Sequence, residues 1–380
     1  MSTVANPSFT RTDTSLISRW WWTIDRLTLT AFVTLIAIGA VMTMTASPAV
    51  AERIGLDQFH FVRRQFVFLQ LGLIVMFATS LLSPRGIRRT SVIFFLAAIV
   101  LMAVTLLMGQ DIKGATRWLQ IGSFSFQASE FVKPSFAIIA AWMFAERRLD
   151  ERSPGYAVAT VLFVIVVGLL AMQPDVGMII VVAAIWSIQF FLAGLPLILV
   201  VMIAFIFLSG IVSAYFIFDH VQVRIDRFLD PASGENYQVA RGLEAFRNGG
   251  LFGRGPGEGH VKGVLPDAHA DFIFSVAGEE FGLVLCLLLV GLFAFVVLRG
   301  FARVLKDNDL FILLAVSGLL VQFGLQAIIN MASATSLMPP KGMTLPFISY
   351  GGSSTLALAY GMGMVLALTR ERPREGGRHD

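Results

Sequence analysis

Charged residues are scarce in this chain of 380 residues. Asp, Glu, Lys and Arg make up 14% of the sequence, whereas soluble domains carry roughly 25%. The chain also holds a single cysteine, Cys286, which excludes a disulfide framework and a cysteine-based metal site. Hydrophobic residues account for 56% of the chain. This composition predicts a polytopic integral membrane protein.

Long apolar runs recur along the chain. A bilayer core of ~30 Å requires about 20 apolar residues per helix. We therefore expect an all-α fold with about ten membrane spans, near residues 27–47, 65–82, 91–109, 130–145, 156–172, 177–194, 197–218, 271–298, 309–332 and 353–369. Residues 27–369 then form the membrane domain, between an N-terminal tail (1–26) and a C-terminal tail (370–380). A large extracytoplasmic loop, 219–270, joins the seventh and eighth spans.

The basic residues predict the orientation of these spans. Sixteen of the 29 Lys and Arg residues fall in the segments on the side of the N-terminus, and seven fall in the short segments on the other side. The remaining six lie in the loop 219–270, which is too long to indicate topology. Because short cytoplasmic loops are enriched in Lys and Arg, both termini are predicted to be cytoplasmic.

Carboxylates near residue 271 interrupt an apolar run. Asp271 stands at the mouth of the run, and Glu279 and Glu280 lie inside it. An ionised carboxylate at bilayer depth costs at least ~2.5 kcal/mol, so such residues usually face a wet cavity or a partner. At 100° per residue, Glu279 lies about 80° round a helix from Asp271 and Glu280 about 180°. Of the two, Glu279 is expected to share a cavity with Asp271.

Several basic residues lie on the side where basic residues are usually avoided: Lys113, Arg117, Lys133 and Lys341. Each is explained singly as a snorkelling or salt-bridged anchor. Together they indicate a site for an anion, since Lys and Arg bind phosphate oxygens. Lys133 also follows Glu130 by three residues, a spacing that is typical of a structural ion pair on one helical face.

Three polar segments break the apolar pattern. Gln173-Pro174-Asp175 predicts a tight turn between spans, in which Asp175 is not required by the turn itself. The glycine-rich segment 249–260 matches no P-loop and is typical of a surface turn. It belongs to the loop 219–270, however, and a loop as long as that is usually functional. Residues 339–354, rich in Pro and Gly, predict a packed re-entrant turn before the last span.

These motifs, in this order, resemble the SEDS family (shape, elongation, division and sporulation proteins). The resemblance rests on Lys113-Gly114…Arg117-Trp118, Gln127-Ala128-Ser129-Glu130-Phe131…Lys133, Gln173-Pro174-Asp175, His269-Ala270-Asp271-Phe272 with Glu279-Glu280, and Pro346-Phe347-Ile348-Ser349-Tyr350-Gly351-Gly352-Ser353-Ser354. Pro340-Lys341-Gly342 looks like the FtsW-like division branch rather than the RodA-like elongation branch. Ala128 and Ala270 stand where the family usually has Pro and Thr.

The resemblance implies a peptidoglycan glycosyltransferase that polymerises lipid II at the outer face of the bacterial cytoplasmic (inner) membrane during septal synthesis. Asp271 matches the family's essential acid, and a carboxylate at a helix mouth suits a general base. The implied substrate-binding positions are Lys113, Arg117, Trp118, Glu130, Lys133, Asp175, His269, Lys341, Ser349 and Ser353, with Glu279 as a further cavity acid. The implied partners are a class B penicillin-binding protein, other division proteins and membrane lipid, without nucleic acid. No cofactor is implied, and a divalent cation stays open.

Two other functions remain open at this point. A lipid II flippase would also need many spans, cavity acids and basic loops, but it should carry charge across the full bilayer depth, often in repeated halves. A non-catalytic division scaffold would have no need for Asp271. Here the charge on the spans clusters on the outer side, apart from Glu279 and Glu280, and no internal repeat is evident, which favours catalysis at the outer face.

Overall fold

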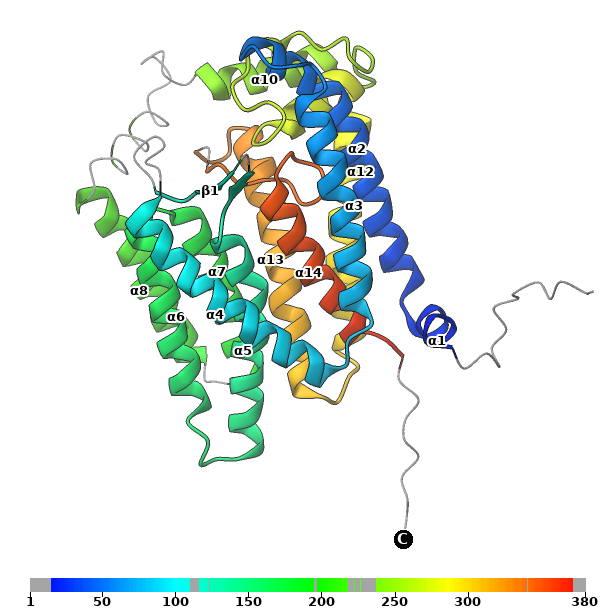
Figure 1. The fold of residues 1–380 in the computed structure, drawn as a ribbon. Coiled ribbons are helices and arrows are strands. Elements are labelled where there is room, and N and C mark those ends of the chain that lie inside the picture. Colours follow the sequence, from blue (N-terminus) through cyan, green and yellow to red (C-terminus); the bar gives the residue numbers. More distant parts are fainter. Residues whose placement is uncertain are drawn as a thin grey trace, which may run out of the picture.

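The computed structural model describes residues 15–109, 116–122, 124–194, 197–217, 222, 226, 237–339 and 341–371. The long helices run side by side in one bundle (Figure 1). Helix α1 (Leu16–Thr23) and residue 371 lie at one end of the bundle, called here the α1 end. Helix α10 (Tyr237–Gly249) lies at the opposite end, called the α10 end.

Each expected span coincides with a helix of the described chain. These helices are α2 (Arg26–Arg53), α3 (His60–Ser80), α4 (Pro84–Met108), α5 (Ser129–Leu149), α6 (Gly155–Met172), α7 (Val176–Leu192), α8 (Leu197–Ile217), α12 (Ile273–Val304), α13 (Leu310–Ala334) and α14 (Gly352–Leu368). Six of them, α2, α3, α4, α6, α12 and α13, are long and apolar enough to cross a membrane, and α7 and α14 are shorter apolar helices. The polytopic helical fold is thus confirmed, whereas ten crossings stay a prediction.

Some short elements were not expected. The chain after α4 forms an antiparallel pair of strands, β1 (Leu119–Ile121) and β2 (Phe124–Phe126), in which Leu119 lies opposite Phe126. This short hairpin lies beside the helices of an otherwise all-α fold. The long loop contains α10 and a single turn, α11 (Val261–Val264), in its described part. The strands also lie towards the α10 end (Figure 1).

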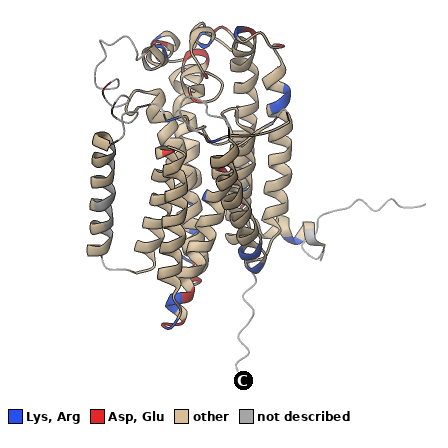
Figure 2. Ribbon diagram, turned by 60° about the vertical axis from the view of Figure 1, so that its left-hand side comes forward, with Lys and Arg blue, Asp and Glu red and all other residues tan. Residues whose placement is uncertain are grey.

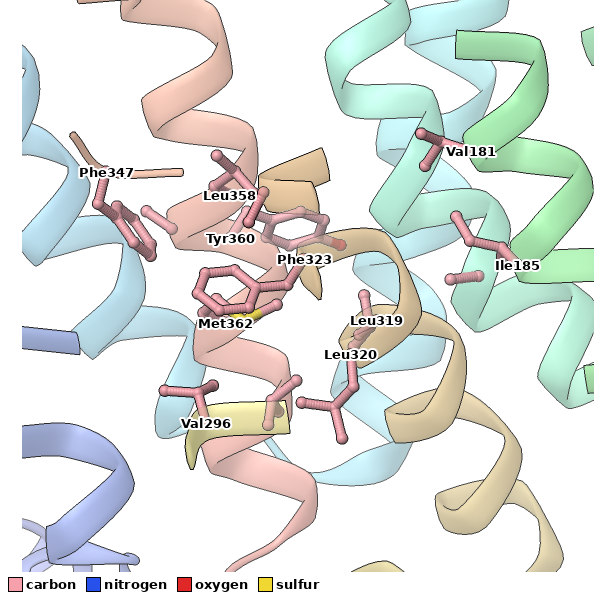
Figure 3. Close-up of a cluster of buried hydrophobic side chains, with 14 of the residues drawn as sticks. Val181, Ile185, Val296, Leu319, Leu320, Phe323, Phe347, Leu358, Tyr360 and Met362 are labelled. Atoms are coloured by element: carbon pink, nitrogen blue, oxygen red, sulfur yellow. The ribbon is translucent and has the colours of Figure 1, made fainter. Parts of the chain in front are cut away.

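Helices α5, α13 and α14 form the interior of the bundle. Small residues let α14 approach its neighbours closely: a Cβ on Gly363 would lie 2.6 Å from the carbonyl oxygen of Met76 on α3, and a Cβ on Gly352 would lie 2.5 Å from the ring of Phe68. Side chains from α12, α13 and α14 meet in the core, as Val296, Phe323 and Met362 illustrate (Figure 3).

The segment between α13 and α14 turns back into the bundle, as the re-entrant prediction requires. Phe347 is 2% exposed and packs edge-on against Phe32, with ring centroids 6.1 Å apart, and against Phe323 at 6.3 Å. Its φ of +63° is in the left-handed region, and the peptide it precedes passes so close to α2 that only glycine fits at position 39. The ring of Phe347 therefore fixes this turn to the hydrophobic core (Figure 3).

Charged residues concentrate at the two ends of the bundle, and few colour its middle (Figure 2). At the α1 end, Asp25 accepts two hydrogen bonds from Arg299, at 2.7 and 2.8 Å, and lies 3.3 Å from Arg303. Arg303 also donates to the carbonyl of Thr369 at 3.0 Å. This network joins the start of α2 to the ends of α12 and α14.

Helix α12 is broken at Gly282, whose φ of +76° and ψ of −173° are not helical. The segment that follows α10 supplies the missing hydrogen bonds: the carbonyls of Gly250 and Leu251 accept from the amides of Leu283 and Val284, at 3.0 and 3.2 Å. A Cβ on Gly282 would lie 2.4 Å from the carbonyl oxygen of Leu251. The break in α12 and the loop therefore depend on each other.

We predict that Gly282→Ala destabilises the protein by about 2 kcal/mol or more, because alanine meets both an unfavourable φ and a backbone clash. The measurement is the temperature at which the buried thiol of Cys286 becomes reactive to a maleimide dye. Gly291→Ala in the same helix is the matched control, since an added Cβ there meets nothing within 4 Å. Equal thermal shifts for both variants would contradict a requirement for glycine at the break.

Candidate active site

A cleft of about 340 Å³ opens at the α10 end of the bundle. Its walls come from α3, the β1–β2 hairpin, the start of α5, the segment before α12 and the re-entrant turn. The lining residues are Phe61, Arg64, Phe68, Trp118, Ser125, Gln127, Glu130, Ala270, Asp271, Gly342, Thr344, Tyr350, Gly351, Gly352, Ser353 and Ser354. Aromatic rings, two carboxylates and several hydroxyls thus share one site.

Asp271 precedes the first turn of α12, and its half-buried side chain lines the cleft. Asn330 on α13 holds this position, since its side-chain amide donates to the carbonyl of Asp271 at 2.9 Å and to that of Met343 at 2.7 Å. A Cβ on Gly342 would lie 3.6 Å from Asp271 Oδ2. The carboxylate therefore stands where the chain before α12 meets the re-entrant turn.

Two further hydrogen bonds join these two segments, and a third lies within the re-entrant turn. Ser349 Oγ donates to the carbonyl of Ala270 at 2.6 Å and accepts from the amide of Leu345 at 2.7 Å. The amide of Tyr350 donates to the carbonyl of His269 at 2.9 Å. Ser349 therefore acts as a brace behind the cleft and does not line it.

The floor of the cleft is a buried ion pair. Lys133 Nζ lies 2.8 Å from Glu130 Oε2 and donates to Gln326 Oε1 at 2.9 Å. Lys133 is fully buried, while Glu130 reaches the cleft. The other end of the Gln326 amide donates to Thr344 Oγ1 at 3.1 Å, and Thr344 shares a hydrogen bond of 2.7 Å with Ser354. Charge and hydroxyls are thus linked from α5 to α14.

A second ion pair ties the hairpin region to the turn between α6 and α7. Arg117 lies 3.7 Å from Asp175 and donates to the carbonyls of Gln173, at 3.1 Å, and Pro174. Asp175 also caps α7 by accepting from the amide of Met178 at 3.2 Å. Burial raises the pKa of Asp175, and the nearby charge of Arg117 opposes that rise. Neither Arg117 nor Asp175 lines the cleft.

His269 supports the cleft from behind. Its ring packs against Phe61 and Tyr350, with centroids 4.7 and 5.0 Å away, and both of those rings line the cleft. Burial lowers the pKa of His269 to about 4, with a smaller opposing effect from Asp267. The imidazole is therefore neutral at neutral pH.

The structure separates the predicted site residues into groups. Asp271, Trp118, Glu130 and Ser353 line the cleft. Lys133, His269 and Ser349 lie directly behind its wall, and half-buried Lys341 precedes the lining residue Gly342. Lys113 lies outside the described residues.

Glu279 does not share the cleft with Asp271, contrary to the helical projection. It accepts hydrogen bonds from the amides of His260 and Val261, at 3.1 and 3.0 Å, and from Asn248 at 3.3 Å. The neighbouring Glu280 pairs with Lys262 at 2.5 Å and accepts from the amide of Gly257. Both acids hold the long loop against the broken helix.

Four residues of this site escaped the sequence analysis. Arg64 on α3 carries the one positively charged side chain among the described residues that line the cleft. Gln65 beside it donates to the carbonyl of Ser349 at 3.2 Å and accepts from the amide of Gly351 at 3.3 Å. Gln326 and Asn330 are the other two. The sequence does contain a pattern that indicates Gln326 and Asn330: with Gln322 they form a polar residue at every fourth position of an otherwise apolar helix.

The described residues contain no cluster of three or more His, Cys, Asp or Glu side chains that could hold a metal ion. Glu130 and Asp271 are carboxylates that line the cleft. A divalent cation here would take oxygen ligands from these side chains and complete its coordination with substrate oxygens or water.

The sequence is similar over nearly its whole length to proteins of one family. The family model for cell cycle proteins of the FtsW/RodA/SpoVE type matches residues 25–374. The probable peptidoglycan glycosyltransferase FtsW of Caulobacter vibrioides is 47% identical over 374 residues, which cover 98% of this chain and 96% of that protein. The proteins of the same name from Trichlorobacter lovleyi and Coxiella burnetii are each 34% identical, over 91% and 92% of this chain and 93% and 97% of their own lengths.

Solved structures share the fold. A chain from a structure described as "Structural coordination of polymerization and crosslinking by a peptidoglycan synthase complex" matches with a TM-score of 0.75 and 29% identity, over 92% of this chain and 98% of that one. The rod shape determining protein RodA of Thermus thermophilus matches with a TM-score of 0.65 and 30% identity, over 92% and 97% of the two chains. The chain belongs to the FtsW/RodA/SpoVE family of cell cycle proteins, the SEDS family that its motifs resemble.

Proposed function

We propose that this chain is a peptidoglycan glycosyltransferase that polymerises lipid II into glycan strands, with Asp271 as the general base. The activity class follows from family membership and from relatives that carry this name. One structural observation supports the assignment of Asp271: its carboxylate lines a cleft at the end of the bundle, held between two backbone segments that hydrogen bonds join.

The proposed reaction joins two lipid-linked sugars. The 4-hydroxyl of the acceptor attacks the anomeric carbon of the donor, the bond from that carbon to the pyrophosphate breaks, and Asp271 takes the hydroxyl proton. The electron pair leaves with the pyrophosphate, whose negative charge needs a cation. Arg64 lines the same cleft, and a guanidinium can contact two phosphate oxygens at once. Lys133 acts indirectly, by holding Glu130 in the floor.

The orientation and partner are part of the proposal. The 16 to 7 excess of basic residues supports a cytoplasmic location of the α1 end. The cleft at the α10 end then faces outward, where lipid II presents its sugars. A structural relative comes from a peptidoglycan synthase complex that couples polymerisation to crosslinking, so we propose a class B penicillin-binding protein as the partner and the division septum as the site of action.

We predict that Asp271→Asn abolishes detectable glycan polymer when purified protein is assayed with labelled lipid II. Removal of a general base typically costs 10²–10⁴-fold in rate. Glu258→Gln removes an exposed acid from the loop and is the matched control, with activity expected near the unsubstituted level. A folded Asp271→Asn variant that still polymerises at the normal rate would exclude this mechanism and favour the transporter.

We predict that Arg64→Gln raises the apparent KM for lipid II by about tenfold or more, since a charge-assisted contact contributes roughly 1.5–3 kcal/mol. Arg63→Gln provides a matched control from the adjacent position. The side chain of Arg63 is 76% exposed and pairs with Asp57 at the surface. If the two variants have the same KM, Arg64 does not bind the pyrophosphate.

The low pKa of His269 predicts an acid-sensitive fold. The unfolded chain binds a proton at His269 below about pH 6.5, while the folded chain resists protonation down to about pH 4. Neutral His269 therefore contributes roughly 3 kcal/mol to the free energy of unfolding above pH 6.5, and this contribution is lost as the pH falls through 4. Thermal unfolding of His269→Gln should depend less on pH over this range. Parallel pH profiles for the two proteins would show that His269 is not the sensitive group.

A further inference from the structure

The segment after α10 carries two apolar side chains that the protein leaves uncovered. Phe252 is 82% exposed and Leu251 is 62% exposed. Gly250 and Gly253, with φ of +56° and +79°, flank them and give the chain the sharp turn that presents both side chains outward. We call residues 250–253 the loop tip.

The loop tip is fixed against α12 at a position well inside the helix. The carbonyl oxygens of Gly250 and Leu251 accept from the amides of Leu283 and Val284. Gly282 is about 14 Å along α12 from its first residue, Ile273, at 1.5 Å per residue. The contact is close, since a Cβ on Gly249 would lie 1.9 Å from the carbonyl oxygen of Gly278.

A second contact sets the same level independently. Lys262 donates to the carbonyl of Thr45 at 3.0 Å and pairs with Glu280, two residues before the break. Thr45 lies about 12 Å from the end of α2 at Arg53, inside a helix with the length and hydropathy of a membrane span. The loop therefore does not stand clear of the bundle but descends beside two spanning helices.

Next to the loop tip, α12 presents a row of exposed apolar side chains. Leu283, Val284 and Leu287 are 46%, 55% and 61% exposed, as expected of side chains that contact acyl chains. Exposed Arg247 and Arg254 flank the tip in sequence. An apolar centre with basic residues on both sides fits the boundary between acyl chains and phosphate headgroups.

From these contacts we propose that Leu251 and Phe252 insert into the lipid leaflet at the α10 end and anchor the long loop to the membrane. The occupant of this surface is lipid: acyl chains receive the two apolar side chains, and headgroup phosphates receive Arg247 and Arg254. This membrane contact is independent of the proposed glycosyltransferase activity. It makes the membrane itself a support for the loop that holds α12 at its break.

The single cysteine makes a direct test practical. In a Cys286→Ala background, Phe252→Cys and, separately, Leu251→Cys receive a nitroxide spin label, and the protein is placed in nanodiscs of phosphatidylethanolamine and phosphatidylglycerol without any partner. Collisions of the label with oxygen report acyl-chain contact, and collisions with a water-soluble nickel chelate report exposure to water. Leu287→Cys supplies the lipid-facing reference, and Glu258→Cys supplies the water-facing reference in the same loop.

We expect both loop-tip labels to match the Leu287 reference, with high oxygen and low nickel accessibility. Labels that match the Glu258 reference would overturn the proposal. Labels that are open to the nickel chelate in these nanodiscs and become shielded only when a partner protein is added would also overturn it, in favour of a protein-docking surface. Thermal unfolding by intrinsic tryptophan fluorescence verifies that each labelled variant is folded.

Discussion

The cleft depends on the need to satisfy backbone polar groups where the chain is not helical inside the bundle. The segment before α12 and the re-entrant turn both present carbonyls that no helix can bond, and an unpaired buried carbonyl costs about 1–3 kcal/mol. One amide, that of Asn330, donates to a carbonyl from each segment. Because α13 is among the most buried helices, its position is set by packing on all sides. The backbone at Asp271 is therefore held rigidly, which suits the general-base role proposed for this residue.

The need to satisfy buried backbone polar groups also explains how the long loop is held against α12. The break at Gly282 leaves amides of α12 without helical acceptors, and the carbonyls of the loop replace them. In return, the carboxylates of Glu279 and Glu280 accept from loop amides and from Lys262. The loop is thus part of the helix's hydrogen-bonding pattern. Asp271 precedes the same helix, so a displacement of the loop would change the support of the segment that carries Asp271 without touching the cleft directly.

Much of the fold was predictable because hydropathy and span length are local properties: each expected span coincides with a helix. Asp271 was predictable as a charge at the mouth of an apolar run. The projection that put Glu279 in the cleft failed because Asp271 lies before α12, so the helical angle does not apply to it. Arg64 could not be told from Arg63 by any pattern, since only the tertiary fold turns one inward. The partners of Arg117 and Lys133 were likewise set by distant segments of the chain.

Two buried ion pairs lie next to the cleft. Glu130 compensates Lys133 beneath the floor, and Asp175 compensates Arg117 behind the hairpin. Paired charges in a low-dielectric interior contribute little net field and are costly to separate. Arg64 reaches the cleft from α3, whereas Asp271 reaches it from the segment before α12. A lipid-linked donor would therefore place its pyrophosphate towards α3, with the attacking hydroxyl towards α12. In the proposed reaction, the two faces of the cleft would serve the two halves of one transfer.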